Sequence, residues 1–438
     1  MDNMENMKLE DPEAAHHFML KHPLDITFNH LAPYKTKAPF LVADTIIHRS
    51  HFGHATANST IPAPNKTSYL NGLRGIASLI VALQHTIDGN YPLIHRAWGD
   101  GEESVYVVQL PFIRLIHSGV FMVSIFFVIS GFALAYGPLS KSYALQTVQG
   151  AQGANRISSF PSSIFRRPFR LFLPTIPIIA VSTALVPFGA FYALNSTEAM
   201  EPVAVGFWGH VYYVWTTLIT IITSGSANTP VWPSLIRMTP MVRLPATFLL
   251  LIYSFNLQRM ANCLFISDMF IADFRYFRAN LPELPRMVQQ QQQQITSWLL
   301  LVPIIFLGCW PMHGDATQAP MHLWFIGFNT FGFGVQSFFQ GTCAVALALV
   351  LENLPVLQRV LNTKPVLYLG EVSFSFYLVH WGCGKNFLSY GLKLKMLAAG
   401  YSLIVSWSTC FVIAMLSIML LGDLHWRLVD QKSVQFSH

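Results

Sequence analysis

The residues whose types and spacing best suit chemistry are an arginine and a histidine in the first long apolar segment. Arg74 and His85 stand in LNGLRGIASLIVALQH, 11 positions apart. In an α-helix this spacing places both side chains on one face, about 20° from alignment and about 16 Å apart along the axis. An arginine suits an anionic ligand head, and a histidine can take a proton from a hydroxyl. The alternative for Arg74 is that it only marks the end of the helix. The alternative for His85 is that it is a core histidine whose hydrogen bonds are made within the protein.

A second basic cluster, RRPFRLFLP, contains Arg166, Arg167 and Arg170. Arg167 and Arg170 are three positions apart, so a helix that begins here presents them on one face. Guanidinium groups bind phosphate oxygens two at a time, and three of them would complete a site for a polyphosphate. The simpler alternative is a signal that only orients the chain in a membrane.

The composition defines the elements that must position these side chains. Only 11% of the 438 residues are charged and 53% are apolar, whereas soluble domains carry about 25% charged residues. So few charges cannot cover the surface of a soluble protein of this size, and a chain that faces lipid must satisfy its backbone polar groups within helices. We therefore predict an all-α polytopic membrane protein, a bundle of about 8 (8–10) transmembrane helices.

Apolar runs of about 20 residues give the expected positions of the spans. Residues 1–68 are expected to form a polar, poorly ordered cytosolic segment, and residues 69–434 the membrane domain. The stretch 205–224 is expected at the membrane interface, and 261–277, with Asp268 and Asp273, is expected to be re-entrant or half-buried. The spans themselves are predicted at 72–92, 118–137, 170–194, 244–257, 295–311, 335–352, 365–384 and 398–421.

The charges between the spans predict the topology. The 138–170 connection contains five basic residues and no acid, so we place it, and with it both termini, in the cytosol. Asn195 heads an N-x-S/T sequon and would be lumenal, which makes it the predicted glycosylation site. The endoplasmic reticulum is the expected membrane. Gln289–Gln294 is expected to form a solvated loop.

Charge and cysteine usage restrict the partners. The net charge of +6 comes from short clusters between apolar runs, not from one basic face, so nucleic acid is not expected as a partner. The five cysteines are widely spaced and form no C-x-x-C pair, so no metal or redox site is expected. The lipid bilayer is the expected partner.

Four motifs follow one another along the chain: LNGLRGIASLIVALQH, FFVISGFALAY, RRPFRLFLP and LYLGEVSFSFYLVHW. In this order they resemble the integral-membrane acyltransferase-3 family. The family's Arg-x10-His pattern is met by Arg74 and His85, and its Arg-x-x-Arg pattern by Arg167 and Arg170. The closing stretch 423–430 resembles the endings of fungal members. The resemblance covers about 69–434.

This resemblance implies transfer of an acyl group, usually acetyl from acetyl-CoA, to a hydroxyl group. It implies that His85 is the general base on the acceptor hydroxyl. It also implies that arginines hold the phosphates of CoA, namely Arg74, Arg166, Arg167 and Arg170. Acyl-CoA is then a co-substrate, and no bound cofactor is expected.

Three further residues are candidates for the acceptor pocket. Ser130 lies in the second expected span, where small residues usually serve helix packing. Tyr377 and His380 are three positions apart on one face of a late span. The alternatives for these two are an interface anchor and a span-end histidine.

The expected acceptor is a small lipophilic alcohol, in a fungal secondary-metabolite pathway by resemblance. Acetylation of a cell-wall or surface glycan is the alternative for an enzyme. Two non-enzymatic alternatives are a carrier, against which the sequence shows no repeated halves, and an inactive relative. The last arises because 231–243 contains no glutamate, where fungal members of the family commonly carry a Pro-x-Glu element.

Overall fold

The computed structural model describes residues 67–88, 91–100, 105–147, 172–185, 240–256, 258–279, 286–312, 321–326, 330–382 and 391–436. All of them belong to the compact unit Lys66–His438. Within these ranges every regular element is helical, which confirms the predicted all-α class. The predicted interfacial stretch 205–224 lies outside the described residues, as does nearly all of the predicted N-terminal segment.

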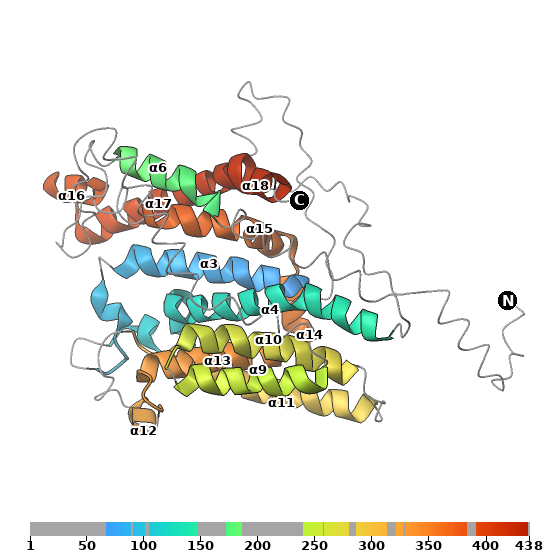
Figure 1. The fold of residues 1–438 in the computed structure, drawn as a ribbon. Helices are drawn as coiled ribbons and strands as arrows, with labels where there is room; N and C mark the ends of the chain where they lie inside the picture. Colours follow the sequence, from blue (N-terminus) through green and yellow to red (C-terminus); the bar gives the residue numbers. More distant parts are fainter. Residues whose placement is uncertain are drawn as a thin grey trace, which may run out of the picture. The chain divides into compact units, whose positions relative to one another are not determined.

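Helix α3 (Ser68–Asp88) is the element around which the site is built. It packs between α15 (Lys364–Val379) and α4 (Gly119–Thr147) (Figure 1). Glycines let α3 and α15 approach closely: a Cβ added to Gly75 would lie 2.4 Å from the backbone nitrogen of Gly370. A Cβ on Gly370 would lie 2.3 Å from the carbonyl oxygen of Asn71. The two backbones are therefore in direct contact, as small residues allow between membrane helices.

A second group of helices covers the other side of α4. Helix α10 (Met260–Ala279) packs on α4, on α9 (Pro240–Asn256) and on α13 (Val335–Leu351), and α13 in turn packs on α11 (Arg286–Gly308) (Figure 1). The main hydrophobic core lies among α3, α4, α10 and α13. Its fully buried side chains include Phe121, Ile125, Met269 and Leu354.

The C-terminal helices complete the layer on the α15 side. Helix α17 (Leu403–His425) and α6 (Thr175–Leu185) both contact α15. A π-helical turn, Trp426–Asp430, leads from α17 into α18 (Gln431–Phe436). Shorter helices are η1 (Pro92–His95), η2 (Val107–Gln109), η3 (Ile113–His117), α12 (Leu323–Ile326), α14 (Pro355–Leu361) and α16 (Gly391–Ala398).

Two helices in the described part of the chain are long and apolar enough to cross a bilayer. They are Gly119–Gly137 and Leu403–Gln435, at two of the expected positions. A third span results if α13 and α14, which meet at an angle of 101°, count as one broken span. Helix α3 forms where the first span was expected but is not among them. The total of about 8 (8–10) spans therefore stays a prediction.

Two interpretations of local structure were wrong: the re-entrant course, which was one of the two alternatives for 261–277, and the loop at 289–294. The stretch 261–277 is not re-entrant: α10 is continuous, with Asp268 and Asp273 only 2% and 1% exposed. Both carboxylates face the protein interior and not lipid. A continuous helix can therefore carry them, and the segment does not have to turn back toward water. The polyglutamine stretch 289–294 is not a loop but part of the first turns of α11, because glutamine is a good helix former and solvated glutamines need no packing partner.

The glycine contact between α3 and α15 generates the first prediction. We expect Gly75→Ala to reduce the free energy of unfolding by about 1–3 kcal/mol or more. The new methyl group would overlap backbone atoms of α15, which can move only if the whole helix shifts. Gly137→Ala is the matched control: nothing lies within 4 Å of its added Cβ, and the better helix former should leave stability unchanged or higher. Thermal unfolding in detergent measures both. Equal midpoints for the two variants would contradict the close packing.

Candidate active site

His85 lies in the last turn of α3 and meets the end of α15. Its ring stacks on that of His380 with a centroid distance of 5.3 Å. The ring of Trp381 meets it edge-on at 4.7 Å. Tyr377, one turn earlier on α15, has its ring centroid 5.1 Å from that of His380. The structure thus brings together three of the residues that the sequence singled out, from segments nearly 300 positions apart.

A backbone contact fixes the tautomer of His380. Its Nδ1 lies within hydrogen-bond distance of the carbonyl oxygen of Tyr377. A carbonyl oxygen can only accept, so Nδ1 carries the proton in this bond. In the neutral ring Nε2 is then a hydrogen-bond acceptor. His380 can in this way orient a hydroxyl group beside His85.

The rim of this site is aromatic and partly open. Tyr377 and Trp381 are 41% and 43% exposed, whereas His380 is 5% exposed. Phe126 of α4 lies across from Tyr377, with ring centroids 5.9 Å apart. A histidine pair with an exposed aromatic rim suits a ligand that combines an apolar body with a hydroxyl group.

Arg74 contacts the same partner helix three turns away from His85. Its Nη2 donates to the carbonyl oxygen of Gly370 at 2.8 Å. One turn earlier, Asn71 Nδ2 donates to Glu371 Oε1 at 2.7 Å. Arg74 and His85 therefore both face α15, in keeping with the predicted alignment on one face.

The C-terminal motif supports α15 through a buried carboxylate. Asp423 is 1% exposed and accepts hydrogen bonds from the hydroxyl of Tyr368 and from Nε of Arg427, the latter at 2.9 Å. A buried carboxylate without such donors would be costly. The pairing explains why Asp423 and Arg427 occur together in the closing stretch.

His425 connects three elements that bear on the site. Its Nε2–H donates to the carbonyl oxygen of Pro174, and its Nδ1 contacts the hydroxyl of Ser375, each at 2.9 Å. Pro174 ends the RRPFRLFLP motif, so this imidazole ties that motif to α15 and α17. Sequence reasoning assigned no role to His425 or to Trp381, although both lie within quoted motifs. Only their positions beside other predicted residues could have indicated them.

The other predicted residues are not brought to His85 by any described contact. Ser130 is exposed on α4, while the neighbouring Gly131 packs on the backbone of Phe265. The predicted phosphate ligands Arg166, Arg167 and Arg170 lie outside the described residues, as does the predicted glycosylation site Asn195. Within the described part of the chain, no group of three or more His, Cys, Asp or Glu side chains could hold a metal ion.

Two of the described helices are apolar and long enough to cross a bilayer, and a histidine pair is packed where α3 meets the end of α15. Together they define a membrane protein that is helical throughout its described part and carries a candidate general base. The chain matches the family model described as an acyltransferase domain over residues 67–423, and it therefore belongs to the acyltransferase-3 family. It is an enzyme that transfers acyl groups.

A fungal relative supports this assignment. The chain is 29% identical to the O-acetyltransferase PaAT-1 of Phomopsis amygdali over 444 aligned residues, which cover 85% of this chain and 84% of that protein. No solved structure matches the chain.

The hydrogen bond from Tyr368 to Asp423 generates the second prediction. We expect Tyr368→Phe to reduce the free energy of unfolding by about 1–3 kcal/mol, because the buried carboxylate loses a donor. Tyr401→Phe is the matched control. Tyr401 is 56% exposed, so water can take over any hydrogen bond that its hydroxyl makes. Thermal unfolding midpoints in detergent decide the comparison. A Tyr368→Phe midpoint equal to that of the control would mean that the carboxylate does not need this donor.

Proposed function

We propose that the protein transfers an acyl group, acetyl in the first instance, from acyl-CoA to a hydroxyl of a small lipophilic alcohol. The observation that carries this proposal is the position of His85, packed against His380 and Trp381 where the rim of the site is aromatic and open. The family and the named activity of the fungal relative support acetyl transfer to oxygen. A fungal secondary-metabolite pathway and the endoplasmic reticulum complete the proposed setting.

In the proposed reaction His85 is the general base. It takes the proton of the acceptor hydroxyl while the oxygen attacks the thioester carbonyl carbon and forms a C–O bond. The tetrahedral intermediate then expels CoA as a thiolate as the C–S bond breaks, and protonated His85 returns the proton to the sulfur. His380 orients the hydroxyl through Nε2. No covalent enzyme intermediate is needed when both substrates are bound together.

Arg74 is the proposed anchor of the CoA phosphates within the described residues. It lies about 16 Å along α3 from His85, a distance that a pantetheine arm can bridge between phosphates and thioester. Its bond to the carbonyl of Gly370 uses one N–H group and holds the guanidinium in place. Arg166, Arg167 and Arg170 are proposed to supply further charge to the same phosphates.

The first functional prediction concerns His85. Purified protein with acetyl-CoA and 1-decanol should release CoA, measured with a thiol reagent. We expect His85→Ala to reduce kcat by about 10²–10⁴-fold, the usual contribution of a general base. Gln292→Ala, on an exposed turn of α11, is the control and should retain full activity. Full CoA release and ester formation by His85→Ala would refute its role, and no CoA release by well-folded wild type would favour a carrier or an inactive relative.

The second functional prediction concerns Arg74. We expect Arg74→Ala to raise KM for acetyl-CoA about tenfold or more with little change in kcat, because charge-assisted bonds to phosphate are lost before chemistry begins. Arg74→Lys should restore only part of the affinity, since an ammonium binds phosphate as a point charge.

Asn71→Ala is the control for packing. It removes a bond from α3 to α15 one turn from Arg74, so it should lower stability without changing KM. If Asn71→Ala raised KM as much as Arg74→Ala, the effect of Arg74 would come from packing and not from phosphate binding.

A further inference from the structure

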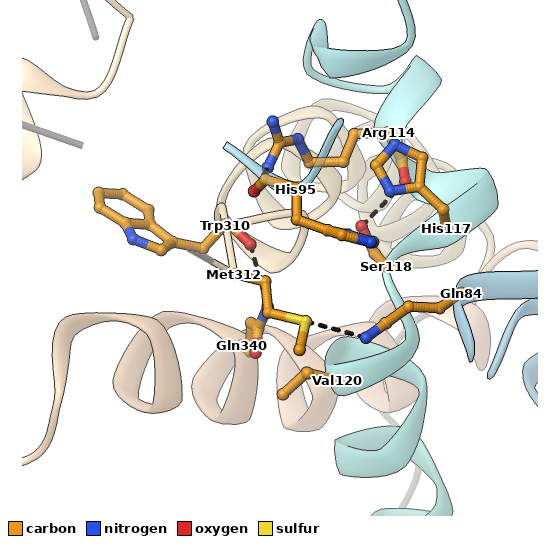
Figure 2. Close-up of a pocket in the computed structure, with 9 residues that line it drawn as sticks. All are labelled: Gln84, His95, Arg114, His117, Ser118, Val120, Trp310, Met312 and Gln340. Atoms are coloured by element: carbon orange, nitrogen blue, oxygen red, sulfur yellow. Dashed lines mark hydrogen bonds between the residues drawn. The ribbon is translucent and has the colours of Figure 1, made fainter. Parts of the chain in front are cut away.

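A polar pocket lies beside the last turn of α3, on a different face from His85. It is formed where η1, η3 and the start of α4 meet the segment just after α11 and the first half of α13, and Figure 2 shows the side chains that line it. It has room for about one water-sized group. The residues that line it are Gln84, His95, Arg114, His117, Ser118, Val120, Trp310, Met312 and Gln340.

The pocket contains a buried cation and no acid. Arg114 is buried and donates three hydrogen bonds, all to backbone carbonyl oxygens: those of His95, Arg96 and Gln109. Two of its five N–H groups make no hydrogen bond among the described residues. Burial lowers the pKa of Arg114 to about 10, so the side chain stays charged at neutral pH. The pocket therefore offers donors and repels a second cation.

The opposite wall offers an acceptor. Gln340 Nε2 donates to the carbonyl oxygen of Trp310 at 3.1 Å, and this bond fixes the orientation of the amide because a carbonyl can only accept. Gln340 Oε1 is buried and has no donor among the described residues. A buried acceptor without a donor is unfavourable. This oxygen can therefore accept a hydrogen bond from a ligand group that carries an O–H or N–H.

The histidines of the pocket add neutral contacts. His117 Nε2–H donates to the carbonyl oxygen of Val108 at 3.0 Å, which leaves Nδ1 as an acceptor in the neutral ring. Burial, with smaller contributions from Arg114 and His95, lowers the pKa of His117 to about 4. The ring is therefore neutral at physiological pH and adds no second charge to the pocket.

These groups select one kind of ligand atom. An ammonium could donate to Gln340 but would be repelled by Arg114. A carboxylate would suit Arg114 but has no hydrogen for Gln340. A hydroxyl, of water or of an alcohol, can do both: it can accept from an N–H of Arg114 and donate to Oε1 of Gln340, and it has the size of the water-sized space.

The pocket lies close to the proposed reaction centre. Gln84, which lines it, directly precedes His85 on α3, and Gln84 packs on Gly119, where a Cβ would come within 2.3 Å of Oε1 of Gln84. The segment that carries Arg114 also presents apolar side chains outward. These are Val105, Val107, Phe112, Ile113 and Ile116. These exposed side chains offer apolar contacts to the body of a ligand whose hydroxyl enters the pocket.

The geometry points to a second hydroxyl subsite: the pocket between Arg114 and Gln340 binds a hydroxyl of the acceptor other than the one that is acylated. This inference rests on the proposed function and narrows its substrate class from lipophilic alcohols to lipophilic diols or polyols. Arg114 and Gln340 would then determine specificity, whereas His85 carries out the chemistry.

The test compares 1-decanol with decanediols whose second hydroxyl is placed at successive carbons. Kinetics with acetyl-CoA give kcat/KM for each alcohol, and thermal unfolding without acetyl-CoA reports binding alone. Wild type should prefer at least one diol over 1-decanol by roughly tenfold or more, as expected when a hydroxyl satisfies a buried acceptor. Gln340→Met, which keeps the side-chain volume, should lose this preference while KM for acetyl-CoA stays unchanged.

Thr342→Val is the matched control on the exposed side of α13 and should keep the preference for the diol. Wild type that acylates 1-decanol and every diol equally would overturn the subsite and leave the proposed function intact. A diol preference that survives in Gln340→Met would overturn it too. Diol-selective thermal stabilisation that depends on Gln340, without any acyl transfer, would support the subsite and refute the proposed function.

Discussion

The close approach of α3 to α15 is the constraint on which the site depends. Gly75 and Gly370 allow the backbones to touch, and no other residue fits at either position without moving a helix. Because the helices are in contact along several turns, Arg74 reaches a carbonyl of α15 at one end and His85 reaches His380 at the other. The distance between the proposed anion anchor, Arg74, and the proposed general base, His85, is thus set by the rise of a single helix against a rigid partner.

Buried polar groups secure the remaining elements around this pair. Asp423 joins α15 to α17 through Tyr368, and His425 joins both to Pro174 at the end of the arginine-rich motif. Arg114 holds the connection between α3 and α4 through three carbonyl groups. In surroundings of low polarity each of these groups must find its partner, so the network specifies which segments meet more strictly than apolar contacts could.

The helical class could be predicted from the sequence, because long apolar runs with few charges are typical of membrane helices, and two of the predicted spans form helices long and apolar enough to cross a bilayer. The two incorrect predictions of local structure concerned segments that contain polar residues. Asp268 and Asp273 suggested a re-entrant segment, but tertiary packing buries them within a continuous α10. The glutamine run suggested a loop because it is polar, yet helix propensity and the continuation into an apolar helix decided its structure.

The sequence by itself determined the helical class, the acyltransferase motifs and the alignment of Arg74 with His85, because these depend on composition and on the period of one helix. Only the tertiary structure decided which residues surround His85. His380 and Trp381 come from α15, and helical periodicity carries no information about which helix packs opposite. The pocket of Arg114 and Gln340 likewise combines segments more than 200 residues apart, and its unsatisfied acceptor becomes apparent only when every buried donor has a position.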